Sequence, residues 1–490
     1  MKIYHLSINY ITQLFKSTLI KNSSWGVLSQ FSQTVFLSLF FVILAREYTT
    51  EIFAKYIIAW ALYQLVTAFS TMGLSQWFIR EFIGSTNKDE LTSRFLKMQI
   101  YFGVVFYIIN ILLAYLLYDE KLTRLLIIVL GANVIFDNLI NAIKCLNIAT
   151  LEQKNTFIIL TIETFLKFLA ACILFLYPFS IITLSLIILG IRFLTLNLFL
   201  TVGSSNSVSI KSLIKFKIFY ADIKRLVVLN WAFIIIGGVS IINWRLANIV
   251  ISKMLTAFDV ANYEISFKVF SIAQTLPVVI STSVFPLLVK LYAKDDKREF
   301  LTFYKKVHLY YLLFGLLSYT FIYSFSGKLI PLVFGNNYIS NAQYTRQMFL
   351  TILVFPTALL QANMLITINL EKLDMLFNTI ALIINFAICL IGLTFIKSLS
   401  VVNYSIFASF FVFHISQDVV LIKRGITSLK SVIKFYMVSA IFVFTYIYSS
   451  NIVNPYLLFL LAWIIVLSFL FLTKNKKIYQ KYKLRMGYSE

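Results

Sequence analysis

The feature that most constrains this chain is a series of fourteen apolar stretches, each long enough to cross a bilayer. A helix needs about 20 mostly apolar residues to cross about 30 Å of hydrocarbon. These runs are too long for barrel strands, and a backbone in lipid must satisfy its own hydrogen bonds, so the sequence predicts an all-α integral membrane protein. The predicted spans are 25–45, 53–79, 98–118, 123–143, 157–177, 181–201, 226–251, 261–289, 308–326, 346–368, 376–396, 401–421, 433–450 and 456–473.

The distribution of lysine and arginine predicts the orientation of these spans. With the N-terminus in the cytoplasm, 31 of the 43 basic residues fall in inner segments, eight in outer loops and four within spans. This asymmetry follows the positive-inside rule and places both termini in the cytoplasm. The net charge of +23 is then explained by this rule and by anionic lipid, so it does not indicate nucleic-acid binding. The chain is 60% hydrophobic and 13% charged, unlike soluble domains with about 25% charged residues.

A polar, basic segment at 202–225 divides the spans into six before it and eight after it. Because six is even, both halves begin on the same side, which predicts parallel repeats. Ala54-Lys55-Tyr56 and Ala261-Asn262-Tyr263 recur at an offset of 207. The predicted organisation is an interfacial helix (1–24), an N-lobe (25–201), a basic cytoplasmic linker (202–225), a C-lobe (226–421), two further helices (433–473) and a basic cytoplasmic tail (474–490).

Two short regions carry a resemblance to a known superfamily. The run from Glu51 to Tyr56, continuing through Gly73-Leu74 to Arg80, resembles the second helix of polysaccharide-export proteins. Ala261-Asn262-Tyr263, Pro277, Phe285-Pro286-Leu287 and the acidic pair Asp295-Asp296 resemble their eighth helix and the loop after it. The chain therefore resembles the O-antigen flippases (Wzx type) of the multidrug/oligosaccharidyl-lipid/polysaccharide (MOP) exporter superfamily. This resemblance implies a MATE-like fold and export of a lipid-linked glycan.

The chain departs from this superfamily in its seventh helix. Many relatives carry an acidic residue there, whereas this chain has Trp244-Arg245. No residue names a coupling ion, so coupling to a proton or a sodium gradient stays open. The sequence predicts no cofactor.

Charged residues inside the spans are the first candidates for a binding site, because each costs roughly 2.5–3.5 kcal/mol at mid-bilayer without a partner. Arg245 would suit a diphosphate or an acidic sugar, since its planar fork donates several hydrogen bonds. The alternative is that Arg245 extends toward the outer interface. Two Glu–Lys pairs follow i,i+4 spacing and either neutralise each other or line a cavity. They are Glu264 with Lys268 and Glu163 with Lys167.

Arg192, in the sixth span, either extends to the interface or pairs with Glu163. Asn133, Asp137 and Asn141 make one face of the fourth span polar, which favours a water-lined face over hydrogen bonding between helices. Gln64 and Gln30 add amides that suit sugar hydroxyls or simple helix packing. His414 and Asp418 form either a proton relay or a structural contact.

The sequence shows no phosphate-binding loop, no His/Cys cluster for a metal and no nucleophile elbow, so it predicts no catalytic residues and no enzyme. The leading hypothesis is a flippase of the bacterial cytoplasmic (inner) membrane. It would bind a polyprenyl-diphosphate-linked oligosaccharide between 25–201 and 226–421 and reopen outward. The lipid tail would leave the cavity beside the last two spans. The expected partners are this glycan lipid, membrane lipids and other polysaccharide-assembly membrane proteins.

Two alternatives remain open. A drug/cation antiporter of the same superfamily would need a net acidic cavity, whereas four cations lie in the spans of this chain. A glycan polymerase or ligase would need a large outer loop with catalytic Arg or His, which the predicted topology lacks.

Overall fold

The computed structural model describes residues 18–150, 152–203, 242, 244–293 and 297–485, and all regular secondary structure in these residues is helical. Twelve helices in this part of the chain are long and apolar enough to cross a membrane. A thirteenth apolar segment, Pro455–Ser468, corresponds to the last predicted span. Most of the predicted seventh span, 226–251, lies outside the described residues, as do residues 204–225 of the predicted linker.

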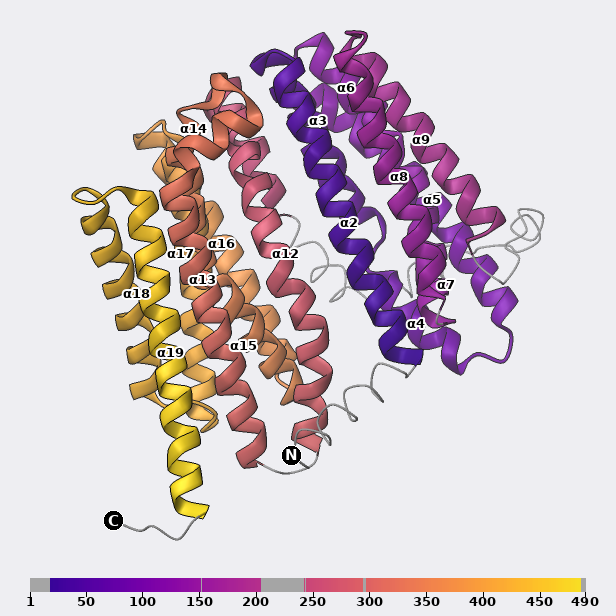
Figure 1. Ribbon diagram of the computed structural model, residues 1–490. Helices are drawn as coiled ribbons and strands as arrows, with labels where there is room; N and C mark the ends of the chain where they lie inside the picture. The colour runs from indigo at the N-terminus through magenta and orange to yellow at the C-terminus, as the bar shows by residue number, and fades with distance from the viewer. Residues whose placement is uncertain (1–17, 151, 204–241, 243, 294–296, 486–490) are drawn as a thin grey trace.

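The first half of the chain forms one helical bundle, which we call the N-lobe (Figure 1). Its helix α2 begins at Thr18, so residues 18–24 of the predicted interfacial helix continue into the first span, while residues 1–17 lie outside the described part. α6 and α7 together form the fourth span. The elements are α2 (Thr18–Glu47), α3 (Thr50–Ser70), α4 (Leu74–Gly84), α5 (Lys88–Leu117), α6 (Lys121–Gly131), α7 (Asn133–Ala149), α8 (Gln153–Cys172), η1 (Ile173–Phe175) and α9 (Ile181–Thr201).

The predicted second span, 53–79, is not one continuous helix, and the prediction was wrong on this point. Met72 and Gly73 both have positive φ angles, of 50° and 61°, which end α3 before α4 begins. Glycine adopts this left-handed conformation without a steric penalty, whereas methionine does so only under strain. The break turns α4 so that Ser75 accepts a hydrogen bond from the Asn141 side chain at 2.9 Å.

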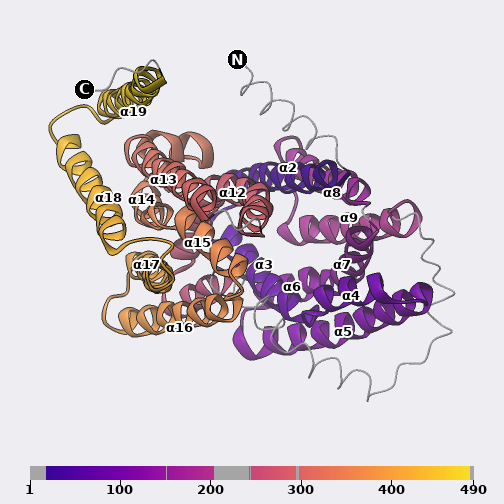
Figure 2. The same ribbon diagram turned by 90° about the horizontal axis from the view of Figure 1, so that it is seen from below.

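The second half of the chain forms the C-lobe, flanked by two further helices (Figure 2). The tenth predicted span, 346–368, corresponds to α14, η3 and α15. α18 and α19 pack against α13, on the side of the C-lobe away from the N-lobe. The elements are a helical segment at 244–254, α12 (Ala257–Ala293), α13 (Lys297–Phe334), η2 (Asn336–Tyr338), α14 (Asn341–Met348), η3 (Phe349–Leu353), α15 (Phe355–Thr367), α16 (Glu371–Phe395), α17 (Leu399–Lys423), α18 (Leu429–Ser450) and α19 (Pro455–Arg485).

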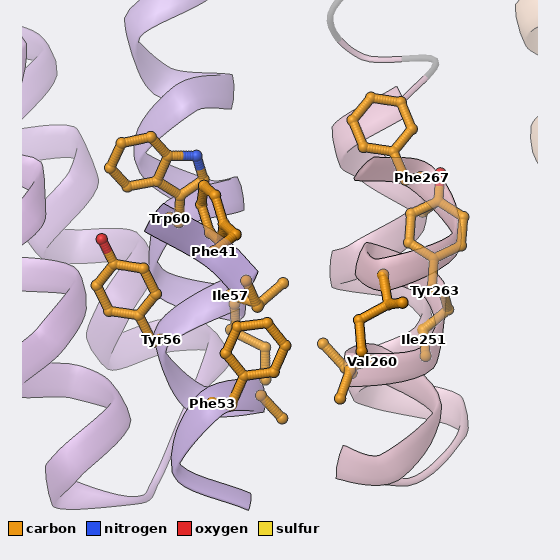
Figure 3. Packing of buried hydrophobic residues seen from close by; sticks show 14 of the residues in the cluster. Phe41, Phe53, Tyr56, Ile57, Trp60, Ile251, Val260, Tyr263 and Phe267 are labelled. Atoms are coloured by element: carbon orange, nitrogen blue, oxygen red, sulfur yellow. The ribbon is translucent and has the colours of Figure 1, made fainter. Parts of the chain in front are cut away.

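The two lobes meet through a largely apolar interface, where α12 packs against α2 and α3. Figure 3 shows N-lobe side chains such as Phe41, Phe53 and Ile57 facing Ile251 and Val260 of the C-lobe. All five side chains are buried, and removal of this apolar area from water or lipid headgroups stabilises the contact.

Polar contacts reinforce the same end of the molecule, which we call the closed end. Nε of Arg46, at the end of α2, donates to the Val333 carbonyl at 2.7 Å, and the same guanidinium also donates to the Leu332 carbonyl. The Tyr118 hydroxyl lies 2.9 Å from Oγ of Ser252, across the lobes. The ammonium of Lys253 lies 4.2 Å from the centre of the Tyr118 ring. At the opposite end, where α2 begins and α19 ends, the lobes diverge (Figure 1).

Candidate functional site

A cavity of about 660 Å³ lies between the two lobes. The N-lobe supplies most of its lining from α2, α3, α4, α7, α8 and α9, and the C-lobe supplies Trp244, Arg245 and Phe267. Six charged side chains line this cavity, four of them cationic and two acidic, so its surface has an excess of two positive charges. They are Asp137, Lys144, Glu163, Lys167, Arg192 and Arg245.

Four of these charges form one compensated cluster in the N-lobe. Arg192 of α9 bridges Asp137 of α7 and Glu163 of α8. Nζ of Lys167 lies 2.5 Å from Oε1 of Glu163, whose side chain is only 2% exposed. Two cations thus alternate with two carboxylates, and the cluster has no net formal charge. Buried charges are tolerated in this way because each has an opposite charge and directed hydrogen bonds.

The Tyr63 hydroxyl donates to Asp137 from α3 and ties a third helix to this cluster. We expect Tyr63→Phe to lower the free energy of unfolding by about 1.5 kcal/mol, because Asp137 loses a hydrogen bond to its charged oxygen. The matched control is Tyr56→Phe on the same helix, whose buried hydroxyl has no partner among the described residues. Thermal unfolding in detergent should show the loss for Tyr63→Phe alone. Equal effects of the two substitutions would contradict this assignment.

Lys144 is a cavity residue that the sequence pattern did not identify. The predicted fourth span ends at residue 143, which leaves Lys144 in an inner loop, but α7 continues to Ala149 and Lys144 lines the cavity. Asn141 follows Asp137 by four residues and Lys144 follows Asn141 by three, so all three lie on one helix face. This spacing is the signal that could have identified Lys144. Within the described residues Lys144 forms no salt bridge. Its ammonium is therefore the cavity cation without a carboxylate partner.

The C-lobe contributes Arg245, which is held from behind by a buried carboxylate. Nη1 of Arg245 lies 3.2 Å from Oε1 of Glu264, a residue with no exposed surface. The same carboxylate accepts from Nδ2 of Asn248 at 3.0 Å and lies 3.3 Å from Nζ of Lys268. The guanidinium also lies 5.0 Å from the centre of the Phe267 ring. These contacts fix the orientation of Arg245, whose side chain lines the cavity.

The structure brings some of the predicted site residues together and leaves others apart. The cavity lining includes Gln64, Asp137, Asn141, Glu163, Lys167, Arg192 and Arg245. Gln30 is exposed and lies outside this lining. Asn133 is buried and donates to the Leu130 carbonyl at 2.8 Å. Glu264 and Lys268 lie behind Arg245 rather than in the lining.

The sequence of the N-lobe and of much of the C-lobe carries a family signature. A family model described as "Polysaccharide biosynthesis protein" matches residues 43–343, well over half of the chain. The chain belongs to this family. No curated protein shows a significant sequence match to it.

Solved structures show the fold that this polysaccharide biosynthesis protein shares with MOP transporters. It is similar to the lipid II flippase MurJ in an inward closed conformation, with a TM-score of 0.68, 16% identity and coverage of 91% of this chain and 99% of MurJ. An inward-facing MATE family multidrug resistance transporter gives a TM-score of 0.65 at 14% identity, over 78% and 92% of the chains. A MOP superfamily transporter from Pyrococcus furiosus gives 0.60 at 12% identity, over 82% and 93%. The predicted all-α, MATE-like fold is confirmed, and the family match confirms that the chain is a polysaccharide biosynthesis protein.

Proposed function

We propose that this protein is a flippase that moves polyprenyl-diphosphate-linked oligosaccharide repeat units across the bacterial cytoplasmic membrane by alternating access. The repeat unit would be that of an O-antigen or a related surface polysaccharide. The observation that carries this proposal is a cavity with excess positive charge, placed between two lobes of a polysaccharide biosynthesis protein. MurJ, with the same fold, is named as a flippase of lipid II.

The cavity lining offers two kinds of side chain to this cargo, cations and amides. Lys144 and Arg245 are suited to the diphosphate, because one is a cation without a carboxylate partner and the other presents a planar fork held by Glu264. Gln64 and Asn141 supply amides for sugar hydroxyls. Asp137 and Glu163 are compensated by Arg192 and Lys167, so they add little repulsion toward an anion.

The polyprenyl tail would remain in the membrane. An apolar groove of about 840 Å³ lies between α13, α18 and α19, and Leu312, Leu316, Val438 and Phe442 line it. Lys305 and Lys434 also contribute to the lining. This groove would receive part of the tail beside the last two helices.

In the proposed orientation the closed end faces the outside of the cell. The end where α2 begins and α19 ends would face the cytoplasm, as the lysine and arginine distribution predicts. The structure would then represent an inward-facing state, ready to accept cargo made in the cytoplasm. Inward conformations of MurJ and of a MATE transporter share this fold.

A cell lacking this protein tests the proposal. We expect lipid-linked repeat units to accumulate in the cytoplasmic leaflet, protected from a membrane-impermeant glycan-labelling reagent in intact cells. Reintroducing the wild-type chain should restore labelling. If repeat units reach the outer leaflet normally while efflux of cationic dyes falls, the protein is a drug antiporter instead. The excess positive charge of the cavity argues against that alternative, since organic cations favour an acidic site.

A further inference from the structure

We propose that Glu264 couples the binding of an anion by Arg245 in the cavity to opening of the closed end. The coupling acts through Lys268 and the Phe41 ring of the opposite lobe. The identity of the occupant as a diphosphate rests on the proposed function, whereas the chain of contacts does not. Neither membership of the polysaccharide biosynthesis family nor the shared MOP fold assigns this role to these residues.

The contacts form one continuous path from the cavity to the lobe interface. Arg245 lines the cavity and Glu264 lies 3.2 Å behind it. Lys268 lies one helical turn further along α12, 3.3 Å from the same carboxylate oxygen. Its ammonium is 3.8 Å from the centre of the Phe41 ring, which belongs to α2 in the N-lobe. Lys268 therefore contacts both a carboxylate of its own lobe and an aromatic face of the other lobe.

Phe41 is a structural part of the closed end. Its side chain is fully buried, and it packs edge-on against Trp60 and Phe40 with ring centroids 5.7 and 5.3 Å apart. A cation over a desolvated ring is attracted by the ring quadrupole, strongly enough to change an equilibrium by roughly threefold to thirtyfold. The Lys268–Phe41 contact thus favours the state in which the lobes touch.

The Lys268–Phe41 contact depends on whether an anion is bound in the cavity, because Lys268 and Arg245 share the charge of Glu264. The buried carboxylate is shared between Arg245, Asn248 and Lys268. An anion in the cavity draws the N–H groups of Arg245 away from the carboxylate. Lys268 is then the main cation that compensates the buried Glu264 carboxylate, because an uncompensated buried charge is costly. Its ammonium therefore moves toward Glu264 and away from the Phe41 ring. The closed end loses one of its attractive contacts when cargo is bound.

A second cation–ring contact supplies the matched control. Lys253 lies 4.2 Å from the Tyr118 ring, also across the lobes at the closed end. Its ammonium has no contact with Glu264 among the described residues. Removal of the Tyr118 ring should therefore weaken closure without changing how closure responds to Arg245.

The first experiment needs no ligand. Spin labels are attached at Tyr177→Cys in the N-lobe and Ile339→Cys in the C-lobe, both exposed, after Cys145, Cys172 and Cys389 are replaced by Ala. Pulsed distance measurements in lipid nanodiscs then give the ratio of open to closed molecules. We expect Arg245→Gln to raise this ratio by roughly fivefold. It should have no further effect in a Phe41→Leu background and its full effect in a Tyr118→Leu background. If Arg245→Gln raises the ratio of open to closed molecules by the same factor in both backgrounds, the coupling is overturned.

The second experiment leaves Arg245 intact and so does not depend on the folding of its variant. Farnesyl diphosphate, a soluble polyprenyl diphosphate, is titrated into wild type, Phe41→Leu and Tyr118→Leu. We expect opening in wild type and Tyr118→Leu, and a response at least threefold smaller in Phe41→Leu. Equal responses in all three proteins would overturn the coupling and leave diphosphate binding intact. If the first experiment shows coupling but farnesyl diphosphate opens none of the proteins, the diphosphate cargo is wrong and the contact path stands.

Discussion

Replacing Arg192 by glutamine is expected to lower the free energy of unfolding by about 3 kcal/mol, twice the loss expected for Tyr63→Phe in the same cluster. Arg192 is the cation between Asp137 and Glu163, and its loss leaves two buried carboxylates with Lys167 as their remaining cation. Removing one partner of a buried ion pair costs more than the pair itself contributes, because the desolvated charge that remains is uncompensated. Thermal unfolding in detergent and the yield of monodisperse protein measure the effect.

The control for this prediction restores charge balance without restoring the arginine. In Arg192→Gln/Asp137→Asn the remaining pair is Glu163 with Lys167, and the cluster is again neutral. We expect the double variant to recover most of the lost stability. The cluster is not an electrostatic unit if Arg192→Gln is as stable as wild type. The same conclusion follows if the double variant is less stable than Arg192→Gln alone.

The second large effect concerns transport. We expect Lys144→Gln and Arg245→Gln each to reduce export of lipid-linked repeat units by roughly tenfold, and the double variant by roughly a hundredfold. These values follow from about 1.5 kcal/mol for each hydrogen bond to a charged group, with 1.4 kcal/mol corresponding to a factor of ten. Export by Arg245→Lys should lie between wild type and Arg245→Gln, because an ammonium keeps the charge but cannot form the bidentate hydrogen bonds of a guanidinium.

The comparison must hold protein level and folding constant. Lys154→Gln is the matched control, since Lys154 lies outside the cavity lining with its ammonium 6.0 Å from the centre of the Trp25 ring. Quantitative immunoblotting of membranes and surface labelling of glycan measure level and export together. Full export by the double variant at a normal protein level would show that these cations do not bind the cargo.

The sequence predicted the fold more fully than the site. Long apolar runs identify membrane helices because length and composition alone decide whether a segment can cross a bilayer. The break at Met72-Gly73 was not predicted, because glycine is common within membrane helices, and only the backbone angles show that the helix ends there. The charges within the spans correctly singled out Arg192 and Arg245 as residues in need of partners.

Side-chain direction is what the sequence could not supply. Lys144 falls in a predicted loop because the apolar run ends one residue earlier, although the helix continues. Lys268 was expected to line the cavity, but the packing of α12 against α2 points it at Phe41 instead. Gln30 and Gln64 are both amides in predicted spans, yet only Gln64 lies on the helix face that meets the cavity. These differences arise from how helices are rotated against each other, which local spacing does not determine.

The contact of Arg46 with the end of α13 has a consequence for how the molecule changes shape. Leu332 and Val333 are among the last four residues of that helix, whose carbonyls have no partner within the helix itself. A guanidinium from the other lobe satisfies them and complements the negative end of the helix dipole. When the lobes separate, water must replace Arg46 at these oxygens. Outward opening is thus also a wetting step, and its rate should fall when water activity is lowered by an osmolyte.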